Sequence, residues 1–267
     1  MLKLDFLSND YKEKKTPAQL AQETIEVDII TGRIPSGKRI NEQDLCRRFS
    51  MSRTPVREIL RRVEANGLAE FIPNRGVFAK GLTQSDVDDL FYLKSILEVQ
   101  CTRWAIERIE DDQMDALSET FDFMQFYTMS NDLGKILRIN EGFDSIIYNS
   151  AHSGELEKRL LRYNFIIKHA NADIKYPLNY LPTVLEEHRA IFDAFTSRDP
   201  DAGAEAVEIH MYKSRMRRKS GNTVLSNNSK MLQQYLCSYE HQYDSPGHCG
   251  LIFISDSEFI AYYNAGS

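Results

Sequence analysis

A single helix start, at Thr54-Pro55, constrains the fold of this chain more than any other feature of its sequence. Thr is a preferred N-cap residue, and Pro suits the first helical position because its fixed backbone angle is already helical. The apolar residues that follow recur at helical spacing and form one stripe: Val56, Ile59, Leu60 and Val63. The pattern predicts a short amphipathic helix that packs against other elements.

Three further elements are predicted around this helix. Gly32 ends the first of them, and the side chain of Asn41 can cap the second. They are a helix over residues 17–31, a short helix that starts at Asn41, and a hairpin of strands 68–72 and 77–79 around a turn at 73–76. Three short helices followed by a hairpin predict a winged helix-turn-helix.

Arg53, Arg57 and Arg61 are spaced by four residues and line the face opposite the apolar stripe. In a winged helix-turn-helix this helix enters the major groove of DNA, where Arg pairs bidentately with guanine. Such a row alone is more often a solvated helix face. The helix start, the preceding short helix and the hairpin together favour DNA binding.

Phosphate contacts are predicted beside these arginines. The hydroxyls of Ser52 and Thr54 lie at the helix start, where backbone N–H groups also attract phosphate. Arg75 in the hairpin turn suits the adjacent minor groove, and Gly76 next to it lets the backbone approach closely.

The charge distribution agrees with a DNA-binding first third. The chain carries a net charge of −6, yet residues 1–82 hold 15 Lys and Arg against 11 Asp and Glu. A basic module on an acidic body is typical of a polyanion-binding unit attached to a unit with another role.

The sequence from Thr83 onward predicts an antiparallel bundle of helices. Thr83 and Asp86 form a capping-box-like start, and Asp199-Pro200 separates the last two helices. Apolar periodicity continues over about 113–129, 131–151, 154–172, 183–196 and 201–218. Helices of this length can enclose a pocket.

Four residues of this bundle could bind a divalent transition metal: Asn140, Asp144, His188 and His210. Asn140 and Asp144 are four residues apart and share a helix face, while the two histidines belong to two later helices. Ligands on separate helices have no fixed sequence separation. Ordinary hydrogen-bonded histidines of a bundle therefore remain the alternative.

The first third resembles the GntR family of bacterial transcription regulators. The resemblance is carried by residues 32–42, by Ser52-Arg53-Thr54-Pro55-Val56-Arg57-Glu58, and by Asn66-Gly67-Leu68. It implies that Arg53 and Arg57 contact bases and that Thr54 contacts phosphate. Some family members have Arg at the position of Gln43, where this chain offers a neutral amide to the DNA backbone.

Residues 83–218 resemble the helical effector domains of the FCD subgroup of that family. The matching stretches are Lys94-Ser95-Ile96-Leu97-Glu98, Asn140-Glu141-Gly142-Phe143-Asp144, and Glu187-His188 with Ala194, Asp199, Ala206 and His210. The resemblance implies a metal ion, often zinc, and a small organic acid that docks on it.

Three departures from the FCD pattern alter the expected site. Asn140 stands where the pattern has Asp, and Asp144 stands where it has His, so harder divalent ions should be favoured over zinc. Lys94 replaces an Arg and keeps a positive charge for an effector carboxylate. Tyr148, one helical turn after Asp144, is expected to face the same cavity.

Composition excludes several other classes. No apolar run approaches the roughly 18 to 20 residues that span a bilayer, and the N-terminus has no signal-peptide core, which predicts a cytoplasmic protein. Cys46, Cys101, Cys237 and Cys249 need form no disulfide in that compartment. In the tail, a helix over 231–239 and a hairpin over 251–254 and 258–263 are expected; a metal cluster of Cys237, His241, His248 and Cys249 matches no standard spacing.

We therefore expect a mainly α protein with four parts: an N-terminal extension (1–16), a winged-helix DNA-binding domain (17–82), a helical effector-binding and dimerisation domain (83–219) and a tail (220–267). The expected function is a ligand-responsive transcription regulator that binds a palindromic operator as a homodimer. The alternatives are a metal sensor without an organic effector and, against the evidence of the DNA-binding module, a metal-dependent hydrolase or lyase.

Overall fold

A computed structural model describes residues 15–170, 180–222, 249–255 and 258–263, with side chains up to Arg218. The chain forms two compact units, Met1–Asn222 and Thr223–Ser267. The predicted helix over 231–239 and the residues Cys237, His241 and His248 lie outside the described residues.

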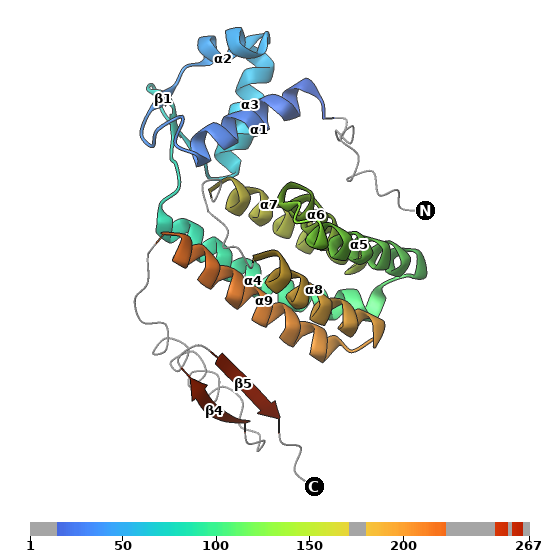
Figure 1. Cartoon of the computed structure of the whole chain (residues 1–267). Helices are drawn as coiled ribbons and strands as arrows, with labels where there is room; N and C mark the ends of the chain where they lie inside the picture. Colours follow the sequence, from blue (N-terminus) through green and yellow to red (C-terminus); the bar gives the residue numbers. More distant parts are fainter. Residues whose placement is uncertain (1–14, 171–179, 223–248, 256–257, 264–267) are drawn as a thin grey trace. The chain divides into compact units, whose positions relative to one another are not determined.

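The winged-helix region consists of the three predicted helices and a small antiparallel sheet, in which a third strand joins the predicted hairpin (Figure 1). In the sheet, β3 lies between β1 and β2, with Arg39 opposite Phe78 and Glu70 opposite the same residue on the other side. The elements are α1 (Pro17–Ile30), β1 (Arg39–Ile40), α2 (Glu42–Phe49), α3 (Arg53–Ala65), β2 (Ala69–Ile72) and β3 (Gly76–Ala79).

Local signals fix the ends of the first two helices. Thr16 and Gln19 form a capping box at the start of α1, with Pro17 in its first turn. Asn41 caps α2, because its Oδ1 accepts a hydrogen bond from the backbone N–H of Gln43 at 2.9 Å. Ser50 then adopts a left-handed conformation with φ of 53°, which ends α2 and turns the chain into α3.

The predicted start of the third helix is wrong by two residues. The N-cap of α3 is Ser52 rather than Thr54, and Pro55 is the third helical residue. This position suits Pro equally, because the first N–H groups of a helix have no partner inside it. Val56, Ile59, Leu60 and Val63 are buried as one stripe, as predicted.

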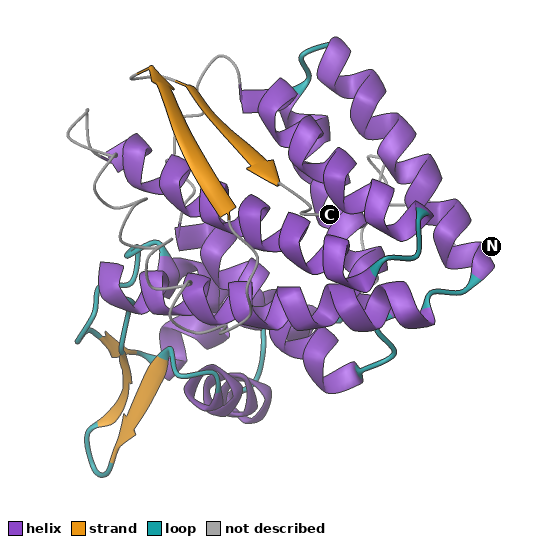
Figure 2. Cartoon of the chain, turned by 90° about the horizontal axis from the view of Figure 1, so that it is seen from below, coloured by secondary structure: helices purple, strands orange, loops and turns teal. Residues whose placement is uncertain are grey.

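The helices of the bundle, drawn in purple in Figure 2, cover the stretches with predicted helical periodicity. α4 packs against α6, α7 and α9, while α8 packs against α5 and α9. The bounds are α4 (Gln84–Arg108), α5 (Asp111–Met129), α6 (Leu133–Ser150), α7 (Gly154–Ala170), α8 (Tyr180–Thr196) and α9 (Pro200–Asn222). The capping box predicted at Thr83 and Asp86 is present at the start of α4.

The contact between α4 and α9 is unusually close. A Cβ atom added at Gly203 in α9 would lie 2.3 Å from Cδ1 of Ile106 and 3.1 Å from Cγ2 of Thr102, both in α4. Ile106 and Thr102 are buried, so neither can move aside freely. Any larger residue at position 203 would therefore require the end of the Ile106 side chain to move.

The second unit contains the predicted hairpin. β4 (Cys249–Ser255) pairs with β5 (Glu258–Tyr263) in antiparallel register, with a bulge between Phe253 and Ser255. Across the described ranges, no helix combines the length and apolar character that a bilayer crossing demands.

Candidate functional site

The N-terminus of α3 presents an exposed basic surface. Arg53 is exposed, whereas Arg57 pairs through Nε with Glu42 Oε2 at 2.9 Å and Arg61 pairs with Glu58 at 2.9 Å. Most of the surface of the Arg57 and Arg61 side chains is open to solvent. Such exposed pairs contribute roughly 0 to 1 kcal/mol, so a DNA phosphate or base can displace their carboxylates.

A shallow hollow between α2 and α3 brings several predicted residues together. Its volume is about 360 Å³, and it is lined by Gln43, Cys46, Arg47, Met51, Ser52 and Arg53. Thr54 is exposed beside it at the start of the same helix. Hydroxyl, amide and guanidinium donors therefore share one surface, and groups of these kinds commonly donate to phosphate oxygens.

The wing holds its arginine in a defined turn. Asn74 has a positive φ of 60°, Gly76 has a φ of 103°, and the guanidinium of Arg75 lies 5.5 Å from the ring centre of Phe78. A Cβ at position 76 would approach the Arg39 guanidinium to 3.2 Å. The positive φ and the nearby Arg39 both favour glycine at this position. Arg39 is a wing-side cation that sequence analysis missed, because the two-residue β1 has no local signal.

A second group of polar residues lies inside the helical bundle. We name it the polar cluster: Lys94 and Glu98 in α4, Asp144 and Tyr148 in α6, and Asn164 in α7. Lys94 Nζ and the Tyr148 hydroxyl both donate to Oε1 of Glu98. Asn164 Nδ2 lies 3.2 Å from the Tyr148 hydroxyl and 3.5 Å from Asp144 Oδ2. Three distant stretches of sequence thus meet through hydrogen bonds.

Burial controls the protonation of the polar cluster. Burial raises the pKa of Asp144 to about 6. The positive charge of Lys94 opposes this shift, and the negative charge of Glu98 adds to it. Burial also raises the pKa of Tyr148 well above its usual value, with Asp144 and Glu98 adding to the shift. Tyr148 therefore remains a neutral hydrogen-bond donor at physiological pH.

The two predicted histidine ligands lie close together, with ring centres 4.8 Å apart. His188 Nδ1 is 2.8 Å from the carbonyl oxygen of Val184, and His210 Nδ1 is 2.9 Å from Glu187 Oε2. Arg217 donates two hydrogen bonds to Glu187, at 2.7 and 2.8 Å. Both rings are thereby oriented through Nδ1, as in metal sites where an acceptor holds the ligand ring.

The charge states of this second group are well defined. Burial lowers the pKa of His188 to about 3, and the neighbouring His210 acts in the same direction. Burial acts to raise the pKa of Glu187, but hydrogen bonds from His210 and Arg217 outweigh it and hold that pKa at about 2. At neutral pH His188 is uncharged and Glu187 is ionised.

The predicted metal ligands fit a metal only in part. Asn140 Oδ1 is buried without a hydrogen-bond partner among the described residues, and the imidazoles of His188 and His210 each keep Nε2 for another contact. Within the described part of the chain, however, no three His, Cys, Asp or Glu side chains gather in a way that would hold a metal ion. The two imidazoles lie together, and the Asn140 oxygen is an unpartnered buried acceptor.

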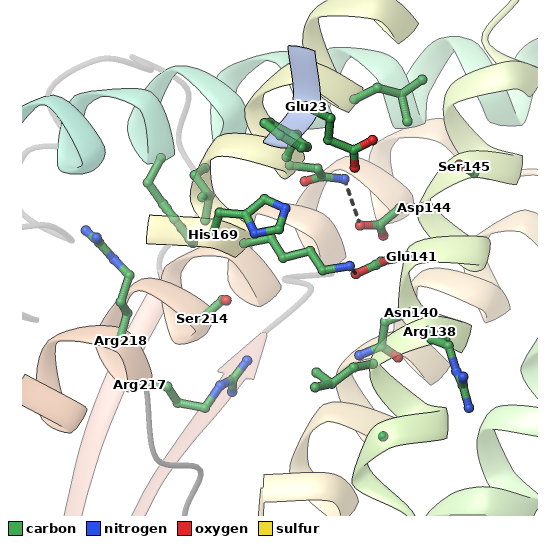
Figure 3. A pocket seen from close by; sticks show the side chains of 18 of the residues that line it. Glu23, Arg138, Asn140, Glu141, Asp144, Ser145, His169, Ser214, Arg217 and Arg218 are labelled. Carbon is green, nitrogen blue, oxygen red and sulfur yellow. Dashed lines mark hydrogen bonds and ion pairs between the residues drawn. The ribbon is translucent and has the colours of Figure 1, made fainter. Parts of the chain in front are cut away.

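A cavity of about 740 Å³ opens beside these groups (Figure 3). Asn140 and Asp144 line one wall, which belongs to α6, and Ser214, Arg217 and Arg218 of α9 line another. Of the other predicted residues, Lys94, Tyr148, His188 and His210 are not among those that line it. Arg217 was missed by sequence analysis, although it lies seven residues after His210, on the same side of its helix.

Comparisons with known proteins agree with this architecture. The model of the bacterial regulatory proteins of the gntR family matches residues 17–79, and the FCD domain model matches residues 89–213. The chain is 30% identical to the Nta operon transcriptional regulator of Aminobacter aminovorans, over 66% of this chain and 82% of that protein. It is 27% identical to the HTH-type transcriptional regulator YdhC of Bacillus subtilis, over 76% of this chain and 92% of that protein.

Solved structures share the fold. Escherichia coli McbR/YncC superposes with a TM-score of 0.61 at 16% sequence identity, covering 78% of this chain and all of that one. The related proteins and the two domain models belong to transcription regulators and not to enzymes. This chain is a transcription regulator of the GntR family, with an N-terminal winged helix-turn-helix and a C-terminal FCD domain.

Proposed function

We propose that this regulator binds a palindromic operator as a homodimer and that a small organic acid in its helical bundle alters its affinity for DNA. The observation that carries the proposal is the position of Arg53, exposed at the first turn of α3 beside the donors of α2. From there a guanidinium can reach base edges in the major groove, with Arg75 in the adjacent minor groove.

Exposed apolar residues on α4 support the homodimer. Tyr92, Leu93 and Ile96 are 51%, 46% and 51% exposed, and their spacing puts them on one side of the helix. A second copy would bury this apolar side and would give the twofold symmetry that a palindrome matches. Ile96→Asp should therefore yield a monomer in sedimentation experiments, whereas Met129→Asp, also at an exposed site, should leave the dimer intact.

The cavity supports a small acid as effector. Lys94 and Tyr148, the residues predicted to contact the acid, are engaged by Glu98 in the bundle. Lys168, Arg217 and Arg218 line the cavity, each paired with a carboxylate (Glu141, Glu187 and Asp88), so an incoming acid would compete with these carboxylates for the cations. The acceptors Asn140 and Asp144 on the facing wall favour an acid that also carries hydroxyl or amino donors.

A divalent metal is the second candidate for the signal. His188 and His210, with the buried oxygen of Asn140, are the donors that would hold it, and a bound metal would supply a Lewis acid for a carboxylate. His188→Ala combined with His210→Ala should abolish metal uptake measured after purification. His152→Asn, at an exposed turn, is the control. Unchanged metal content in the double variant would remove this candidate.

One experiment tests the central proposal. An operator is first selected from random duplexes. The Kd of the protein for this operator and for a scrambled duplex is then measured at two salt concentrations. Each measurement is made without an acid and with each carboxylic acid that raises the Tm of the protein. A specific operator whose Kd shifts with an acid is expected. Ser214→Trp should fill the cavity and abolish the shift, whereas Lys213→Trp, outside the cavity, should preserve it. Equal affinity for all duplexes would refute the proposal.

A further inference from the structure

One face of α7 packs into the winged-helix region (Figure 1). Ile166 is buried in the apolar core formed by α1, α3 and the sheet, and Phe165 packs against the same core. Beside them, Arg162 Nη1 donates to Oε2 of Glu26 in α1. The Arg162 side chain is 25% exposed and that of Glu26 only 4%, so this ion pair is largely shielded from water.

Glu26 connects this ion pair to the end of α3. Its second oxygen accepts hydrogen bonds from Gln22 at 3.0 Å and from Asn66 at 2.7 Å. Asn66 is the C-cap residue of α3. A carboxylate this deeply buried is costly without a cation, and the described contacts supply Arg162 from α7. The position of α7 therefore bears directly on the hydrogen bond that holds the last turn of α3.

The opposite face of α7 reaches the polar cluster. Asn164 lies two residues after Arg162, about 200° away around the helix, and contacts both Tyr148 and Asp144. Leu160 and Ile167, near Asn164 on this face, are buried in the core of the bundle. A single helix thus has one face in each core, with a polar contact on each side.

We propose that α7 couples the polar cluster to the DNA-reading helix through Arg162, Glu26 and Asn66. A change in the hydrogen bonds of Tyr148 or Asp144 shifts Asn164 and with it the helix that carries Arg162. The ion pair passes this shift to Glu26 and to the C-terminus of α3. The inference deepens the proposed function, because it names the route by which events in the bundle alter DNA binding.

A double-mutant cycle tests this route without an effector. Tyr148→Phe removes one hydroxyl from the polar cluster at nearly constant volume, and Arg162→Met removes the ion pair. Operator Kd is measured for the wild type, each variant and the combination. Tyr148→Phe should change the Kd by about threefold or more in the wild type and by less than about 1.5-fold in the Arg162→Met background, because coupled residues are non-additive.

Two further variants make the cycle specific. Arg159→Met removes a different cation from α7, one that is 62% exposed and 3.8 Å from Glu155, and should leave the effect of Tyr148→Phe intact. If Arg162→Met fails to fold, Glu26→Gln replaces it, since a glutamine can still accept from Asn66 but no longer attracts Arg162. An equal effect of Tyr148→Phe in all backgrounds, or no effect in any, would overturn the coupling.

A readout without DNA separates this inference from the proposed function. Hydrogen exchange of the backbone amides at Asn66, Gly67 and Leu68 reports on the last turn of α3. Tyr148→Phe should accelerate this exchange in the wild-type background and not with Arg162→Met. If no operator can be selected but the exchange pattern holds, the DNA-binding proposal fails and the coupling stands. Unchanged exchange refutes the coupling whatever the DNA result.

Discussion

The surface of α3 and the polar cluster both contain ion pairs between a cation and a carboxylate, but the two regions differ in how far water reaches these pairs. Arg57 and Glu42 meet on the surface at 2.9 Å, with 59% and 32% of their side chains exposed. Lys94 and Glu98 meet in the bundle with 9% and 7% exposed. An exposed pair is weak and can exchange partners, whereas a buried pair is costly to break. The first suits reversible contact with DNA, and the second suits a fixed internal framework.

The largest expected effect comes from the buried side of this comparison. Asp144→Asn removes a charge that burial disfavours and should raise the free energy of unfolding at pH 7 by about 2 to 3 kcal/mol. The pKa of Asp144 is 3.8 in the unfolded chain and about 6 in the folded protein. The protonated carboxyl therefore contributes its full stabilisation below about pH 4, and this contribution is lost as the pH rises through 6. The advantage of the variant should therefore vanish near pH 4.

Urea titrations between pH 4 and 7.5, in the presence of a chelator, measure this difference. Asp115→Asn, at an exposed site of α5, is the control and should match the wild type at every pH. A stability difference between Asp144→Asn and the wild type that does not vary with pH would show that Asp144 is not desolvated.

The next largest effect belongs to the exposed surface. Arg53→Ala should cost about 1 to 3 kcal/mol of operator binding and relax base preference, because a bidentate contact to guanine is lost. Its thermal stability should not change, since Arg53 is exposed. Fluorescence anisotropy on operator and scrambled duplexes measures both affinities. Equal losses on the two duplexes would contradict a base-reading role.

A smaller effect, a gain in affinity for DNA, is expected when the carboxylate of an exposed ion pair is neutralised. Glu42→Gln releases Arg57 and removes a negative charge from the face that would meet DNA. Affinity for any duplex should rise by about two- to fivefold, less than 1 kcal/mol, as expected for an exposed pair. Glu119→Gln on α5 makes the same charge change away from this face. A similar gain in that control would mean that net charge alone is responsible.

The smallest effect is expected at the end of the wing. Lys80 is exposed, and Lys80→Ala should weaken all duplexes about equally, by about two- to threefold, because a phosphate contact carries no sequence information. The slope of log Kd against log salt should fall by about one. Lys158→Ala on α7 is the matched control. A loss confined to the operator would assign Lys80 to base recognition instead.

The fold was predictable where local chemistry decides it. The cap at Asn41, the capping box at Thr83 and the apolar stripe of α3 depend on neighbours within a few residues, and all three are confirmed. β1 was not predicted, because a two-residue strand exists only through its pairing with β3.

The candidate site was predictable only in part, because its contacts join distant stretches. Asn140, Asp144, His188 and His210 were named from their motifs, but the contact of Asn164 with Tyr148 and that of Arg162 with Glu26 depend on tertiary packing. The ion pair of Lys94 could have been predicted from the sequence, since Glu98 lies four residues later on the same helix, where opposite charges commonly pair. Its role toward an effector stays a prediction, as do the roles of the DNA-contacting residues.

The bare backbone at Gly203 has a mechanical consequence for the bundle. Ile106 occupies the space that any side chain at that position would need, so α4 and α9 interlock where they cross. Sliding one past the other by a helical turn, about 5.4 Å, would set the branched side chain of Val207 where Gly203 now lies. This crossing therefore opposes sliding of α4 along α9.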